Sequence, residues 1–171
     1  MRKILCLISL AALMSSAALA GSNTANLSVS SSIAANCNIS TTAVGFGAYV
    51  PLAAPAVVQT GSVSYTCVTG TTISSIYLDQ GLNPAGGSSA AVPLRQMSDG
   101  SSHNLTYNLY TVATYTAGNI WGGAAGNFAN SGFTADAASH SITIYGQIDA
   151  GQHSAPVAAS YTDTVVATIN F

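Results

Sequence analysis

Apolar side chains recur at every second residue in several short segments of this chain, which is the spacing of a β-strand with one buried face. In residues 141–148, for example, Ile142, Ile144 and Ile148 lie on one face. No long window has the 3.6-residue spacing of an amphipathic helix. Lys and Glu, which favour helices, are absent after residue 3. The pattern predicts an all-β fold.

The predicted strands are short and are separated by turns rich in Gly, Pro, Asn and Ser. They lie at residues 63–67, 71–80, 105–112, 141–148 and 163–171. In the last of them Val165, Ala167, Ile169 and Phe171 share a face. Many short strands with turns between them are typical of a β-sandwich.

The first twenty residues have the pattern of a secretion signal. Arg2 and Lys3 precede an apolar run at residues 4–14, and residues 18–20 read Ala-Leu-Ala. No later stretch is apolar for long enough to span a bilayer, so we expect an exported protein without a membrane anchor. The expected organisation is a signal peptide at 1–20, an N-terminal extension at 21–35 and one β-sandwich domain at 36–171.

Two cysteines, Cys37 and Cys67, remain after the signal peptide. In an oxidising compartment an isolated pair of cysteines most often forms a disulfide. A reactive thiol or a metal ligand is the alternative, but the chain has neither a CxxC motif nor clustered His and Cys residues. We therefore predict a Cys37–Cys67 disulfide.

Charged residues are scarce. After residue 20, Arg95 is the single basic residue apart from the histidines, against five aspartates. Nucleic-acid binding needs Lys or Arg to replace counterions, so neither nucleic acid nor an anionic membrane is an expected partner. Asp163 and Thr164 are expected to fix a turn through side-chain to backbone hydrogen bonds. A surface built of Ser, Thr, Asn, Gly and Ala suits a packed extracellular assembly.

No arrangement of residues predicts catalysis, a metal site or a cofactor. His103, His140 and His153 lack metal-ligand spacing, and no GxSxG motif is present. We expect a non-enzymatic protein without cofactors. Arg95 is expected to pair with an aspartate or to pack its stem on its own strand. Trp121 is expected to pack in the core or a loop and not to bind sugar.

The segment ANLSVSSSI, residues 25–33, is a strand-like pattern with one apolar face. Its apolar positions are Ala25, Leu27, Val29 and Ile33. A lone amphipathic strand at a free N-terminus frays or aggregates unless it pairs. It therefore either closes the sheet of its own domain or closes the sheet of another molecule.

Four segments of the chain resemble, in the same order, the conserved segments of one known family. Residues 93–123 resemble its R-x-M, L-x-Y-x-L-Y and W-G segments. IYGQIDAGQ at 144–152 is similar to its Y-G-x-I-x-x-G-Q segment, and SYTDTVVATINF at 160–171 to its Y-x-D-T-V closing strand. CNISTTAVGFGAY at 37–49 matches its opening cysteine followed by F-G-x-Y. The chain thus resembles the spore coat protein U domain family, which includes subunits of archaic, Csu-type chaperone–usher pili.

The resemblance implies an incomplete immunoglobulin-like β-sandwich that lacks its last strand. A periplasmic chaperone fills the gap first, and the N-terminal extension of the next subunit replaces it by donor-strand complementation. It implies that Ala25, Leu27, Val29 and Ile33 form the donor strand. It also implies that the closing strand, with Val165, Ala167, Ile169 and Phe171, lines the acceptor groove and faces the chaperone.

The expected function is that of a structural subunit of a secreted chaperone–usher pilus, acting in surface adhesion and biofilm formation. Its expected partners are the chaperone, an outer-membrane usher and copies of itself or sister subunits. It would pass through the periplasm to the cell surface. The alternatives are a secreted lectin-like or adhesive module, or a spore-coat layer protein, with a self-closed sandwich.

Overall fold

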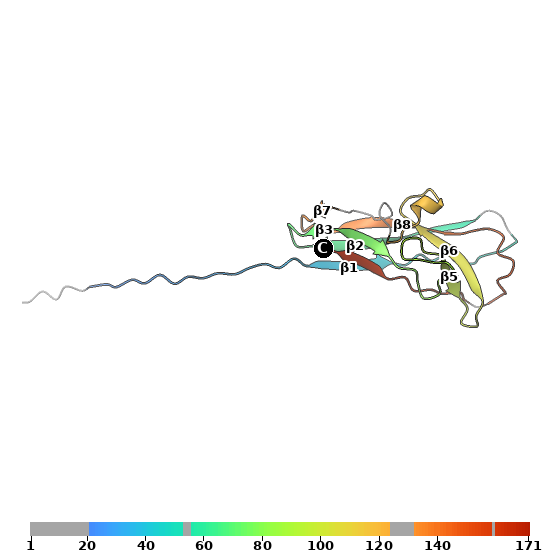
Figure 1. Cartoon of the computed structure of the whole chain (residues 1–171), viewed down its shortest axis with the longest axis horizontal. Coiled ribbons are helices and arrows are strands. Elements are labelled where there is room, and N and C mark those ends of the chain that lie inside the picture. The colour runs from blue at the N-terminus through green and yellow to red at the C-terminus, as the bar shows by residue number, and fades with distance from the viewer. Residues whose placement is uncertain (1–20, 53–55, 124–131, 159) are drawn as a thin grey trace, which may run out of the picture. The chain divides into compact units, whose positions relative to one another are not determined.

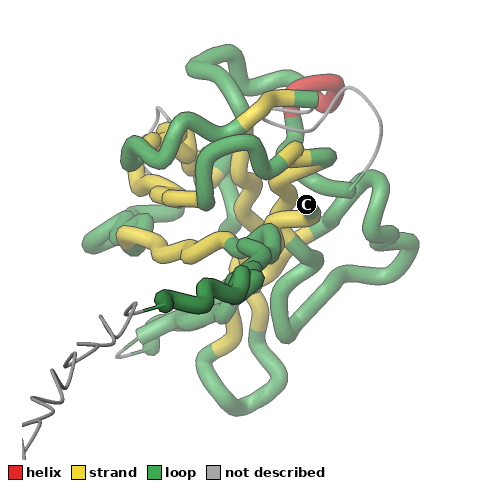
Figure 2. The backbone as a smooth tube through the Cα atoms, turned by 90° about the vertical axis from the view of Figure 1, so that its left-hand side faces the viewer, coloured by secondary structure: helices red, strands yellow, loops and turns green. Residues whose placement is uncertain are grey.

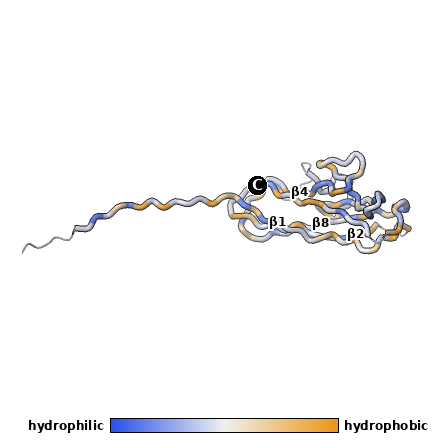
Figure 3. Tube along the Cα trace, turned by 90° about the horizontal axis from the view of Figure 1, so that it is seen from below, coloured by the Kyte–Doolittle hydropathy of each residue, from blue (hydrophilic) through white to orange (hydrophobic). Residues whose placement is uncertain are grey.

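The computed structural model describes residues 21–52, 56–123, 132–158 and 160–171. The predicted signal peptide lies outside the described residues. The chain divides into two units between Ile33 and Ala34. In the first unit, residues 21–33 are exposed and form no strand or helix. Figure 3 shows apolar positions at intervals along this segment.

The second unit is built on a five-stranded antiparallel sheet in the order β1-β2-β8-β6-β5 (Figure 1). Its strands are β1 (Cys37–Thr42), β2 (Val57–Cys67), β5 (Arg95–Ser98), β6 (Asn104–Tyr110) and β8 (His140–Ile148). β2 and β8 are the longest, and they pair from Val57 opposite Ile148 to Tyr65 opposite His140. β1 and β5 are therefore the edges of this sheet.

Two small antiparallel sheets complete the domain. One pairs β3 (Thr72–Ile73) with β7 (Phe133–Thr134), and the other pairs β4 (Ser75–Leu78) with β9 (Ala167–Asn170). A single 3-10 turn, η1 (Ala117–Asn119), is the one helical element among the described residues (Figure 2). The prediction of an all-β fold is confirmed.

The core lies on one face of the main sheet, where alternate residues of its strands are buried. On β2 these are Val63, Tyr65 and Cys67, and on β8 they include Ile144 and Ile148. β4 adds Ile76 and Leu78, β6 adds Leu105, Tyr107 and Leu109, and Trp121 is fully buried among the same residues. The two-residue alternation in the sequence therefore identified the buried faces correctly.

The closing strand is shorter than predicted. The pattern predicts a strand over 163–171, whereas β9 covers Ala167–Asn170. The backbone N–H groups of Thr164 and Val166 donate to aspartate side chains instead of to a neighbouring strand. Phe171 lies beyond the last pair and is half-exposed.

None of the helical structure in the described residues is long and apolar enough to cross a bilayer.

Candidate functional site

The described part of the domain has an apolar groove between the segment that follows β1 and the segment that precedes β9. It contains two hollows. The central hollow, of about 410 Å³, is lined by residues 41–44 and 161–165. The loop-end hollow, of about 520 Å³, is lined by residues 44–49 and 155–158. Val44, Phe46, Met97 and Tyr161 line both, so the hollows are neighbours in one groove.

The floor of the groove is formed by side chains of the main sheet and of β4. It consists of Leu78, Met97, Leu105, Tyr107, Leu109, Ile144 and Ile148. Ile144 lines the central hollow and Ile148 lines the loop-end hollow, four residues further along β8. The groove therefore runs along the strands, and its floor is continuous with the core.

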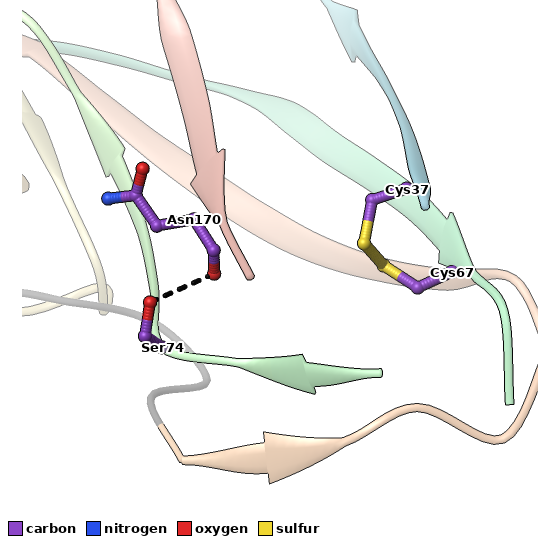
Figure 4. The surroundings of a disulfide bond; sticks show 4 residues. All are labelled: Cys37, Cys67, Ser74 and Asn170. Carbon is purple, nitrogen blue, oxygen red and sulfur yellow. Dashed lines mark hydrogen bonds between the residues drawn. A yellow bond between two sulfur atoms is a disulfide. The ribbon is translucent and has the colours of Figure 1, made fainter. Parts of the chain in front are cut away.

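The groove has two distinguishable ends. β1 begins at Cys37, which is bonded to Cys67, and Figure 4 shows this disulfide near Asn170 of β9. We call this the disulfide end. At the other end lie the loops at 49–52 and 149–158, which we call the loop end. The predicted disulfide is therefore present, and it ties the first residue of β1 to the last residue of β2.

Two glycines allow the segment after β1 to lie flat on the main sheet. A Cβ on Gly146 of β8 would lie 2.6 Å from Val44 Cγ1 and 2.8 Å from Phe46 Cζ. A Cβ on Gly61 of β2 would lie 2.5 Å from the carbonyl oxygen of Thr42 and 2.8 Å from Val44 Cγ2. Because both positions lack a side chain, Val44 and Phe46 reach the floor and form one wall of the groove.

A hydrogen-bond cluster fixes the loop end. The Tyr49 hydroxyl donates to the carbonyl oxygen of Asp149 (2.8 Å) and accepts from the backbone N–H of Gln152 (3.1 Å). The Gln152 amide accepts from the backbone N–H of Thr106 (2.8 Å) and donates to the carbonyl oxygen of the same residue (2.7 Å). The Gln152 side chain thus makes the two hydrogen bonds to β6 that the backbone of a neighbouring strand would make. Tyr49 connects the segment after β1, which we call the β1 wall, to this cluster.

The opposite wall is held by Asp163. Its Oδ1 accepts hydrogen bonds from the backbone N–H groups of Leu82 (2.8 Å) and Thr164 (2.8 Å), and its Oδ2 accepts from the Tyr107 hydroxyl (2.6 Å). Burial, together with this hydrogen bond to a carboxylate, raises the pKa of Tyr107 well above its ordinary value. The expected turn-fixing role of Asp163 is thus present in the structure.

A second aspartate, Asp79, also holds the wall formed by residues 161–166. Asp79 Oδ1 accepts from the backbone N–H groups of Gly81 (2.9 Å) and Val166 (2.9 Å). Gly81 has a φ of +76°, and a Cβ there would collide with the Asp163 carboxylate. The two aspartates therefore hold the segment 163–166 in place without a strand ladder.

Arg95 is fully buried beneath this wall. Its Nε donates to the carbonyl oxygen of Asp79 (2.8 Å), and its Nη2 donates to those of Leu78 (3.1 Å) and Trp121 (2.7 Å). Burial lowers the pKa of Arg95 to about 10. The expected direct pairing with an aspartate is replaced by bonds to carbonyl groups, because the Asp79 carboxylate is already used by Gly81 and Val166.

The groove lies between the main sheet and the β4–β9 sheet, whose neighbouring strands are not hydrogen-bonded to each other. β1, at the edge of the main sheet, is in contact with β9, yet the two belong to different sheets. β9 pairs with β4 on one side only. An edge strand with unpaired backbone groups beside an apolar groove is a site to which another strand can add.

The comparisons with known proteins identify the family. The sequence pattern of the Spore Coat Protein U domain matches residues 23–168, which is most of the chain. This chain belongs to the Spore Coat Protein U domain family.

The chain is also similar to a curated protein in sequence and to a solved structure in fold. The chain is 36% identical to Protein U of Myxococcus xanthus over 165 residues, which cover 89% of this chain and 87% of that protein. Its fold is similar, with a TM-score of 0.54 and 21% identity, to a chain in the CsuC–CsuE chaperone–tip adhesion subunit pre-assembly complex from archaic chaperone–usher Csu pili of Acinetobacter baumannii. The match covers 81% of this chain but 40% of that solved chain.

The Spore Coat Protein U segments noted in the sequence fall on the groove. The opening segment supplies Val44, Phe46 and Tyr49, and the closing segment supplies Tyr161 and Asp163. Of the predicted groove residues, Val165 lines the central hollow. Ala167 and Ile169 are half-buried against the core, and Phe171 is half-exposed at the disulfide end.

Sequence reasoning missed the β1 wall. Val44 and Phe46 follow the strand pattern irregularly, and their role depends on Gly61 and Gly146, which are distant in sequence. The glycines inside AVGFGAY gave no signal of this, since a Cβ on Gly45 or Gly47 would meet nothing within 4 Å.

The histidines lie outside the groove. His103 Nδ1 is 2.7 Å from Asp99 in the turn between β5 and β6, and Nε2 of His140, the first residue of β8, is 2.8 Å from Asp136. Hydrogen bonds from these histidines lower the pKa values of Asp99 and Asp136. Among the described residues no cluster of His, Cys, Asp or Glu could hold a metal ion. The His140 ring also stacks on Tyr65 and contacts Phe133 edge-on, so it helps to pack the start of β8.

Proposed function

We propose that this protein is a structural subunit of a chaperone–usher pilus that polymerises by donor-strand complementation. The proposal is carried by the presence of two complementary features in one chain. The domain has an apolar groove beside β9, which pairs with β4 on one side only, and the extension has an exposed apolar face. Leu27, Val29 and Ile33 are 84–88% exposed. A soluble secreted chain would not keep three such side chains in water without a partner surface.

The dimensions of the extension suit the groove. Residues 25–33 in strand conformation span about 27 Å, which is also the length of the nine-residue strand β8 along the groove floor. Leu27, Val29 and Ile33 would face the floor, while Asn26, Ser28, Ser30 and Ser32 would face solvent. Each buried Leu, Val or Ile side chain contributes about 1.5–3 kcal/mol, so these three are the main driving force.

The direction of the donor strand follows from how the chain is connected. The extension joins the domain at Cys37, at the disulfide end. In a head-to-tail polymer the donating domain must lie beyond the loop end of the accepting domain. Ile33 would then occupy the loop-end hollow and Ala25 would lie near Phe171, so the donor runs antiparallel to β9.

A chaperone and an usher complete the proposal. The half-buried apolar lining of the groove, which includes Val44, Phe46 and Val165, would stay partly exposed in a free subunit, and a chaperone strand would cover it until the next subunit arrives. Export to the periplasm, passage through an outer-membrane usher and a cell-surface location follow from this route. Adhesion and biofilm formation are the proposed uses of the filament.

Deletion of residues 21–33, with the signal peptide retained, tests the proposal. The shortened chain should still be captured one-to-one by the chaperone when the two are co-expressed, but it should not polymerise. A second variant carries residues 22–33 after Phe171 through a short turn. Because Phe171 lies at the disulfide end, the added strand can enter its own groove antiparallel to β9, and the product should be a stable monomer. Loss of stability without any chaperone capture would favour a self-closed module instead.

A spore-coat layer protein is the second candidate, since the family takes its description from the spore coat. Such a protein would use the same sandwich, and the chaperone capture assay separates it from a pilus subunit.

A further inference from the structure

Three exposed apolar residues lie in the two loops that reach the loop-end hollow. Val50, Leu52 and Val157 are 57%, 87% and 104% exposed. The hollow itself is lined by Pro51 and Val157 from the same two loops. Single exposed apolar residues are ordinary, but here one of the three lines the hollow and the other two flank Pro51, which also lines it. We call these three residues the loop-end patch.

Another exposed apolar side chain lies at the disulfide end, beside the point where the extension joins the domain. Val68 follows β2 directly and is 38% exposed. Its backbone N–H donates to the carbonyl oxygen of Asn36 (2.9 Å), the residue before Cys37. Val68 is therefore fixed next to Asn36, the residue that follows the extension.

The short connection between donor strand and domain brings these two places together in a polymer. Four Cα–Cα steps separate Ile33 from Cys37, and they can span at most about 14 Å. With Ile33 in the loop-end hollow of one copy, Cys37 of the donating copy must lie within that distance of the hollow. Its Asn36 and Val68 then lie close to the loop-end patch.

We propose that the loop-end patch is a second interface between successive copies of this chain, and that it packs against the donating copy's surface around Val68. This inference rests on the proposed function, because it takes the donor strand as the connection between the copies. The occupant is a second copy, since the short connection places its disulfide end there. Neither the lining of the loop-end hollow nor the segment 66–70 contains a charged residue, so no repulsion opposes the contact.

Site-specific photocrosslinking in the assembled full-length protein tests this interface. A Leu52→p-benzoylphenylalanine variant is assembled and illuminated, and the adducts are mapped by mass spectrometry. The same substitution at Val112, a 44% exposed position on the loop after β6, is the matched control. The expected result is an adduct between copies on the peptide that contains residues 66–70, several-fold more abundant from position 52 than from position 112.

The outcomes separate the two proposals. Polymers that form normally but give no adduct on residues 66–70 above the control would overturn the second interface and leave donor-strand polymerisation intact. Failure of the unsubstituted chain to polymerise at all would overturn the proposed function, and the interface with it. Adducts that disappear when residues 21–33 are deleted support both.

Discussion

At the scale of single residues, the groove depends on glycines that leave space as well as on side chains that fill it. Gly146 and Gly61 leave room for Val44 and Phe46, which are the β1 wall. Tyr107, Asp163 and Asp79 hold the opposite wall through hydrogen bonds to backbone groups. The groove is therefore a built feature with defined walls.

Gly146→Ala should disturb the β1 wall. The added Cβ would meet Val44 and Phe46 closer than carbon atoms normally approach, so we expect a loss of about 1–3 kcal/mol in stability. Gly118→Ala is the matched control because a Cβ there meets nothing within 4 Å. The midpoint of guanidinium unfolding of the assembled protein measures both. Equal midpoints for the two variants would contradict the packing described for Val44.

Tyr107 should make the protein sensitive to alkali. Its pKa is raised in the folded state, so the unfolded state loses this proton first as the pH rises through the ordinary tyrosine value of about 10. The tyrosine's contribution to stability is therefore complete below that pH and is lost above it. The pKa of Arg95 is lowered in the folded state, so its deprotonation has the opposite effect and favours the folded state as the pH rises.

Tyr107→Phe tests this dependence, since it keeps the ring but removes the ionisable group. The fall in unfolding midpoint above pH about 10 should be shallower in the variant than in the unsubstituted chain, because both keep Arg95. Below that pH the variant should be less stable by about 1.5–3 kcal/mol, since the Asp163 carboxylate loses one hydrogen bond. Parallel pH curves would exclude Tyr107 as the source.

At the scale of elements, the strands were predictable where alternate residues pack on a core within the same chain. The buried faces of β2, β6 and β8 follow the sequence pattern directly. β9 is shorter than its pattern because Asp163 and Asp79 bind the backbone of 163–166, a long-range arrangement that no local pattern contains. The β1 wall was missed for a related reason, since the glycines that make room for it lie on other strands.

In the proposed polymer, the extension is the element on which assembly depends. Val29→Asp places a charge on the face proposed to enter an apolar groove, where it would lack a partner. We expect polymerisation to be lost while chaperone capture is retained. Ser30→Asp, on the opposite face, should polymerise normally. Electron microscopy and size-exclusion chromatography distinguish these outcomes, and equal effects of the two substitutions would argue against a one-faced donor strand.

At the scale of the whole molecule, the Cys37–Cys67 disulfide joins the domain to the base of the extension. It closes a loop with a sequence separation of 30, and its loss should cost about 3–4 kcal/mol through the entropy of the unfolded chain. A Cys37→Ser, Cys67→Ser double variant should therefore unfold at lower guanidinium concentration. The yield of chaperone complex should fall as well, since the start of β1 is no longer tied to β2.

Assembly should depend little on salt. Both proposed contact surfaces are apolar, and the chain after residue 20 has one arginine and five aspartates. Screening by salt acts on charge pairs and so has little to act on here. Polymerisation rates measured at low and high sodium chloride should be similar, and a steep decrease with salt would point to a charged interface elsewhere on the domain.

The burial of Arg95 also bears on how such a filament would survive outside the cell. It is the single lysine or arginine after residue 20, and none of its surface is exposed. Trypsin-like proteases cut after these two residue types, so the folded protein offers them no accessible bond. Cleavage would require local or global opening first, and digestion by trypsin would report directly on the fraction of molecules that have unfolded.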